Sequence, residues 1–125
     1  MQRHSIVLTV LLLAVSTATA QTATSKPEGQ AVMQRYIIER DIPGAGKLTL
    51  DDHRGGAAKS NRVLREMGPD IQWVHSYVAG DKIYCIYNAT SEALVREHAA
   101  RSGFPANKIT PVSMVVDPTT ASPAR

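Results

Sequence analysis

Cysteine, long apolar runs and charge of one sign are all scarce in this chain. Cys85 is the only cysteine among 125 residues, so no disulfide can form within the chain. A lone thiol in an oxidising compartment is buried, metal-bound or paired with another chain. The Lys/Arg and Asp/Glu residues are interspersed, and the formal net charge is only +3. Without a basic stripe, we expect no nucleic-acid surface.

The main apolar run lies at the N-terminus. Arg3 precedes the apolar residues Ile6 to Val15, and Ala18-Thr19-Ala20 has the small-x-small form of a cleavage site. This pattern is typical of a secretory signal peptide, and no later stretch approaches the roughly 20 apolar residues of a membrane span. We therefore predict cleavage after Ala20, an exported protein in the periplasm or outside the cell, and no stable membrane insertion of the mature chain.

The rest of the chain divides by composition into three parts. Residues 21–32 are mostly small and polar and indicate a flexible linker. Residues 33–117 carry the periodic apolar pattern of one folded domain, whereas residues 118–125 are typical of a disordered tail. So small a domain has a marginal core, which dimerisation commonly supplements.

The pattern within residues 33–117 predicts four strands and two helices. Strands are expected at 33–40, 71–78, 82–87 and 108–117, with helices beginning after Thr49 and Ser91 and ending at Gly68 and Gly103. The order β-α-β-β-α-β predicts an α+β fold, the ferredoxin-like sandwich of an antiparallel sheet with two helices on one face.

Two features of this fold call for an explanation beyond secondary structure. Gly55-Gly56 lies inside the first predicted helix, where it costs about 2 kcal/mol relative to two alanines; close approach to the sheet is one interpretation. The first and last predicted strands are substantially apolar on both faces, and two helices can cover only one face of the sheet. We therefore predict a homodimer through the open sheet face.

Three side chains are candidates for chemistry: His75, Cys85 and His98. A three-residue hairpin turn would place His75 directly opposite Cys85, whereas a two-residue Gly80-Asp81 turn would place Ser76 there instead. His98 follows the apolar positions of the second helix and should point towards the sheet. Imidazole and thiolate suit divalent transition metals such as nickel, zinc or copper, so these residues are predicted metal ligands.

Other interpretations of the same residues remain open. Cys85 and His98 are also typical of a small buried hydrophobe and a hydrogen-bonded core histidine, and His75 of a half-exposed strand residue. No nucleophile, base and orienting group stand out together, so catalysis is not expected. The alternative is a dimeric α+β-barrel-type enzyme or small-molecule binder that uses a sheet–helix cavity around His98, with a strand tyrosine as its acid–base partner.

Several segments together resemble the small bacterial nickel-responsive protein family, whose described member binds nickel. The residues that carry the resemblance are Arg35–Arg40 with Pro43-Gly44, Ser60-Asn61, Ile71–Val78, Asp81–Tyr87, Val95–Ala99, Gly103–Asn107 and Asp117–Ala121. The resemblance spans essentially the whole predicted domain. The resemblance implies a ferredoxin-like fold, a homodimer and a bound divalent transition metal ion such as nickel. The ligands themselves rest on side-chain chemistry and not on the resemblance.

Overall fold

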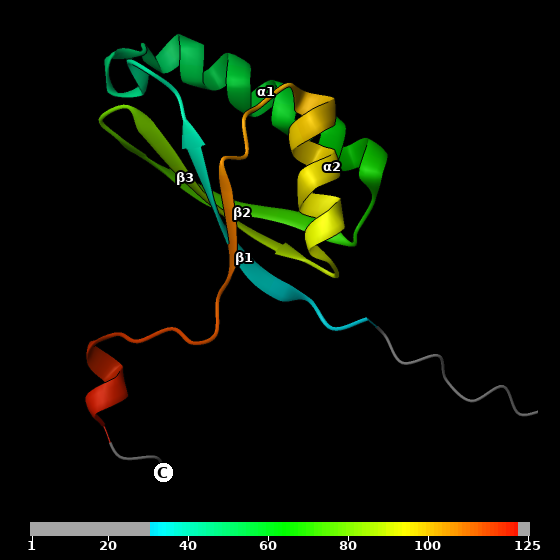
Figure 1. Ribbon diagram of the computed structural model, residues 1–125, viewed down its shortest axis with the longest axis vertical. Coiled ribbons are helices and arrows are strands. Elements are labelled where there is room, and N and C mark those ends of the chain that lie inside the picture. Colours follow the sequence, from blue (N-terminus) through cyan, green and yellow to red (C-terminus); the bar gives the residue numbers. More distant parts are fainter. Residues whose placement is uncertain (1–30, 123–125) are drawn as a thin grey trace, which may run out of the picture.

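The computed structural model describes residues 31–122 (Figure 1). The predicted signal peptide, most of the predicted linker and the last three residues lie outside this range. The strands are β1 (Gln34–Asp41), β2 (Ile71–Ala79), β3 (Lys82–Ala89) and β4 (Lys108–Pro111). The helices are α1 (Leu50–Met67) and α2 (Glu92–Ser102), with short 3-10 turns η1 (Ala45–Lys47) and η2 (Pro118–Ala121). None of these helices has the length and apolar character needed to cross a bilayer.

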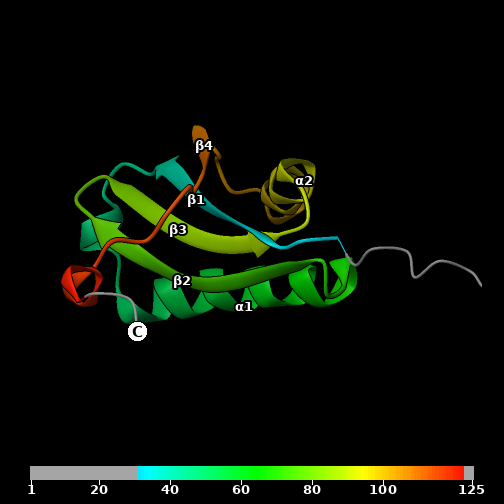
Figure 2. The ribbon, with the colours of Figure 1, turned by 90° about the horizontal axis from the view of Figure 1, so that it is seen from below.

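The four strands form one antiparallel sheet in the order β2-β3-β1-β4. Both α-helices lie on the same side of it, and the opposite side is left open (Figures 1 and 2). With the element order βαββαβ, this arrangement confirms the predicted ferredoxin-like α+β sandwich.

The core lies between the sheet and the helices. Alternate residues of β1 and β3 face inward, as the period of two in a strand requires, and Val95 of α2 packs against them. The buried cluster is Tyr36, Ile38, Ile71, Cys85, Tyr87, Ala89 and Val95.

Local capping explains why the helix ends were predictable. The Thr49 side chain accepts a hydrogen bond from the Asp52 amide, and the Asp52 carboxylate accepts one from the Thr49 amide, which completes a capping box. Ser91 caps α2, and Gly103 ends it in a left-handed conformation.

The Gly55-Gly56 pair lies inside α1, where a Cβ atom at either position would meet nothing within 4 Å. Close approach to the sheet is therefore not its explanation.

The last strand is shorter than the predicted 108–117. Because β4 runs antiparallel to β1, with Tyr36 opposite Pro111, the pairing reaches the start of β1 at Gln34 almost at once. The Val112 amide still donates to the Arg35 carbonyl, but the chain then leaves the sheet as an extended arm (Figure 1). The arm ends in η2, a single ordered turn within the segment predicted as a tail.

Candidate functional site

The turn between β2 and β3 has two residues. Gly80 adopts φ +59°, the left-handed value that a two-residue hairpin turn favours at its first position. Ala79 then pairs with Lys82, and Ser76 lies opposite Cys85. Of the two registers that the sequence left open, the structure has the one that separates His75 from Cys85.

A β-bulge fixes the direction of His75. The ladder passes from the pair Trp73–Tyr87 to the pair His75–Ile86, so Val74 is an extra residue without a partner on β3. Trp73 and Ser76 consequently both face the helices. His75 lies on the open face, exposed to solvent, with its ring edge-on to Tyr77 at a centroid distance of 4.8 Å.

Cys85 lies on the opposite face, buried beside an arginine. The Nε of Arg40 donates to the Cys85 sulfur at 3.3 Å, and its Nη1 donates to the Pro105 carbonyl at 2.6 Å. The guanidinium also lies over the Phe104 ring, 5.5 Å from its centroid. Only 3% of Arg40 is exposed, yet it forms no ion pair with any Asp or Glu among residues 31–122.

His98 is a fully buried core residue of α2. Its Nε2 lies 3.1 Å from the Ser60 hydroxyl and 3.3 Å from the Ser102 hydroxyl, and its ring packs on Tyr87. Its Nδ1 has no hydrogen-bond partner in the described part of the chain. Burial, and to a smaller extent the charge of Arg40, lowers the pKa of His98 from the usual 6.5 to about 4.

The three predicted metal ligands therefore do not converge within one chain. His75 lies on the open face of the sheet, whereas Cys85 and His98 lie on the helix-covered face. Residues 31–122 contain no group of three or more His, Cys, Asp or Glu side chains placed to hold a metal ion.

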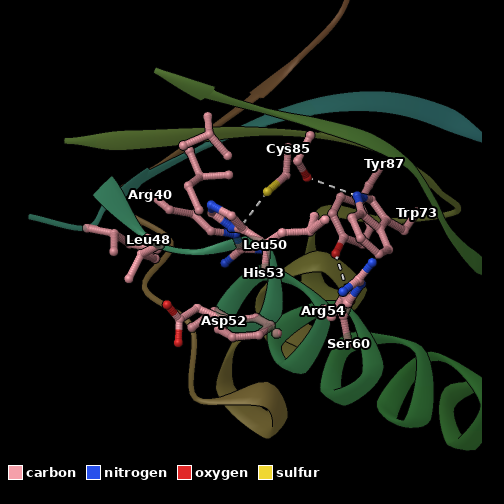
Figure 3. A pocket seen from close by; sticks show the side chains of 17 residues that line it. Arg40, Leu48, Leu50, Asp52, His53, Arg54, Ser60, Trp73, Cys85 and Tyr87 are labelled. Carbon is pink, nitrogen blue, oxygen red and sulfur yellow. Dashed lines mark hydrogen bonds between the residues drawn. The ribbon is translucent and has the colours of Figure 1, made fainter. Parts of the chain in front are cut away.

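A cavity of about 480 Å³ opens between α1 and the sheet (Figure 3). Most of its lining is apolar. The sheet contributes Trp73, Val78, Ile83, Cys85 and Tyr87, and the β1–α1 segment contributes Ile42, Leu48, Leu50, His53 and Gly56. Arg40 and Phe104 also line it. This size and character are those of small-molecule sites in proteins.

His98 lies behind the wall of this pocket and is hydrogen-bonded to Ser60, a residue of that wall. Ser60 lines the pocket and lies 3.3 Å from the Tyr87 hydroxyl and 3.1 Å from His98. Burial raises the pKa of Tyr87 above its ordinary value, so that hydroxyl stays protonated. His98 itself does not line the cavity. Its neighbouring tyrosine is Tyr87, whereas Tyr77 and Tyr84 pair on the open face.

Arg40 and Ser60 were not among the candidate site residues predicted from the sequence, although both lie in segments that carry the family resemblance. One signal for Arg40 was available, because it follows Tyr36 and Ile38 at the same alternate positions of the strand. The hydrogen bonds of Ser60 depend on how α1 packs over β3, which no local pattern encodes.

The comparisons with known proteins agree with this architecture. The model of the family "Nickel responsive protein SCO4226-like" matches residues 36–112, more than half of the chain. The chain belongs to this family. The SCO4226-like assignment confirms the resemblance seen in the sequence.

Among solved structures, the chain is similar to the crystal structure of SCO4226 from Streptomyces coelicolor A3(2), with a TM-score of 0.55 and 19% sequence identity. The match covers 66% of this chain and 99% of SCO4226, so the two share the fold. No curated protein matches the chain.

Proposed function

We propose that this SCO4226-like protein is an exported homodimer that binds nickel at its open sheet face. The observation that carries the proposal is the position of His75, a solvent-exposed imidazole on a face that no helix covers. Imidazole is a favoured ligand for nickel. The description of the family as nickel responsive supports the choice of metal.

The helix-covered face is a poor location for a metal cation, because it already holds the positive charge of Arg40. Arg40 places a fixed positive charge against Cys85 and also disfavours the charged form of His98. A divalent ion there would be repelled by the positive charge of this guanidinium. On the open face His75 lies opposite Ile86 and beside Tyr77, both uncharged, so the proposed ligand set begins with His75 and not with Cys85 or His98.

A second copy of the chain would complete this site and cover the face. Ile37, Tyr84 and Ile86 are half-buried there, and 60% of Tyr77 is exposed. The C-terminal arm adds Met114, Val115 and Val116, each more than 60% exposed. Apolar surface of this extent is typical of a docking face. In a two-fold dimer each protomer would present its own His75.

Native mass spectrometry of the chain from Gln21 onward, with and without Ni²⁺, tests the proposal. We expect a dimer that takes up discrete nickel ions. His75→Ala should weaken nickel binding about 100-fold or more, since loss of even an outer-shell partner of a metal ligand costs about 10–100-fold. His53→Ala, which removes a histidine on the α1 side, is the matched control and should bind as the wild type does. A monomer, or equal binding by the His75 variant, would contradict the proposal.

A second candidate function, small-molecule binding between α1 and the sheet, is favoured by the apolar pocket. Acid–base catalysis by His98 is not favoured, because the ring lies behind Ser60 and is held neutral by its surroundings. The pocket is thus better suited to holding a ligand than to transforming one.

A further inference from the structure

We propose that the pocket between α1 and the sheet binds a small carboxylic acid with an apolar body, whose carboxylate pairs with Arg40. The inference rests on the second candidate function, ligand binding in this pocket, and is independent of nickel binding. It assigns a ligand class to a part of the molecule that the metal proposal leaves unused.

The charge of Arg40 is the first argument. A buried guanidinium is costly unless an anion accompanies it, and proteins usually supply a carboxylate. Here its partners are the Cys85 sulfur, the Pro105 carbonyl oxygen, the Phe104 ring and the Tyr87 hydroxyl, none of which is a carboxylate. A guanidinium has five N–H groups, so donors remain beyond these partners for a ligand at the wall of the cavity.

The shape of the pocket supplies the second argument. Figure 3 shows Arg40 and Cys85 from the sheet and His53 from α1 projecting into one cavity. Leu48, Leu50 and Trp73 give it a largely apolar wall. Such a wall accommodates an alkyl or aryl group. Two other charged residues line the pocket, Asp52 and Arg54, but both are exposed, and they pair with Thr49 and Asp51. Arg40 is thus the buried cation that would fix the orientation of the acidic end. An arginine binds a carboxylate through paired N–H donors more strongly than it binds a neutral group.

Gly56 supplies a third, independent argument. It lines the pocket, and a Cβ atom there would meet open space. Glycine within a helix costs about 1 kcal/mol relative to alanine. No packing contact explains a glycine at this position. The lack of a side chain does, however, leave the pocket open.

The probe is sodium decanoate, with decanamide as its neutral counterpart. Trp73 is the only tryptophan of the chain and lines the pocket, so its fluorescence reports occupancy without a label. We expect decanoate to change the emission saturably and to bind about tenfold or more tightly than decanamide, as hydrogen bonds to a charged group imply.

Two variants test the charge of Arg40 and the open volume at Gly56 separately. Arg40→Met should lose the preference for decanoate while binding decanamide as the wild type does. Arg35→Met is the matched control, because Arg35 lies on the same strand but faces the open side of the sheet and bonds Asn88. Gly56→Leu places a bulky side chain in the pocket while keeping Arg40, and it should abolish binding of both probes. This variant and the comparison of probes on the wild type keep the test decisive even where Arg40→Met fails to fold.

The outcomes distinguish this inference from the functions on which it builds. Equal binding of decanoate and decanamide, lost in Gly56→Leu, would retain the pocket as a ligand site and overturn the role of Arg40. Binding of neither probe would overturn both the pocket and its charge preference. His75→Ala should leave decanoate binding unchanged, so failure of nickel binding has no bearing on this result.

Discussion

The surroundings of His98 hold its ring in the neutral form. Protonation would place a second N–H on the ring, and Nδ1 has no acceptor among the described residues. The Arg40 charge adds to that cost. A neutral ring has one N–H, and of the two ring nitrogens Nε2 is the one with partners, the Ser60 and Ser102 hydroxyls. The ring is therefore best placed to carry its proton on Nε2 and to remain uncharged.

The lowered pKa of His98 makes the free energy of unfolding fall with pH in the mildly acidic range. The pKa of His98 is about 4 in the folded chain and near 6.5 when unfolded, so the unfolded state binds more protons between these values. Its contribution is fully present above pH 6.5 and is lost as the pH falls towards 4, with a loss on the order of 3 kcal/mol. Urea unfolding at pH 7, 5.5 and 4.5 measures this trend. His98→Gln should flatten it, and an unchanged slope in that variant would contradict the assignment.

At the scale of elements, features set by residues close in sequence were predicted correctly, whereas features that depend on distant residues were not. The bounds of α2 and the capping box of α1 follow from side chains within one turn of the helix end. The end of β4 depends instead on where β1 begins, far away in sequence. The hairpin register depended on the length of the turn, and the burial of Arg40 depended on how the helices pack over the sheet. The sequence therefore identified His75, Cys85 and His98 as side chains able to bind metals, but it could not show that they lie on different faces of the sheet.

The paired glycines of α1 give a prediction at this scale. Gly55 is exposed, lies in the helix interior and has space for a Cβ atom. Gly55→Ala should raise the free energy of unfolding by about 1 kcal/mol. Gly103→Ala is the contrasting variant and should lower it, because its φ of +68° strains any residue with a Cβ atom. Denaturant unfolding of both proteins checks the pair, and a destabilised Gly55→Ala would show a requirement for glycine there.

For the whole molecule, the sheet separates two environments. One face is covered by helices and holds a buried cation beside an apolar pocket, whereas the other is open and carries an exposed imidazole. Under the functions proposed above, an anion and a metal cation would bind on opposite sides of a single four-stranded sheet. The two sites would then be separable by mutation.

Export is a prediction for the whole chain. In a bacterial host, the protein should appear outside the cytoplasm with Gln21 as its first residue, as N-terminal sequencing would show. Leu12→Arg places a charge in the middle of the apolar run and should retain the uncleaved chain inside the cell. Cytoplasmic accumulation of an unprocessed wild type would contradict the prediction.

The bulge at Val74 also bears on how this strand tolerates insertions and deletions. A deletion within a strand ordinarily turns every following side chain to the wrong face. Val74 is the exception, because it has no partner on β3, and the residues on either side of it already alternate correctly without it. Removing that one residue would leave Trp73 inward, His75 outward and the ladder continuous. A chain that lacks this one residue would therefore keep the same pocket and the same exposed imidazole.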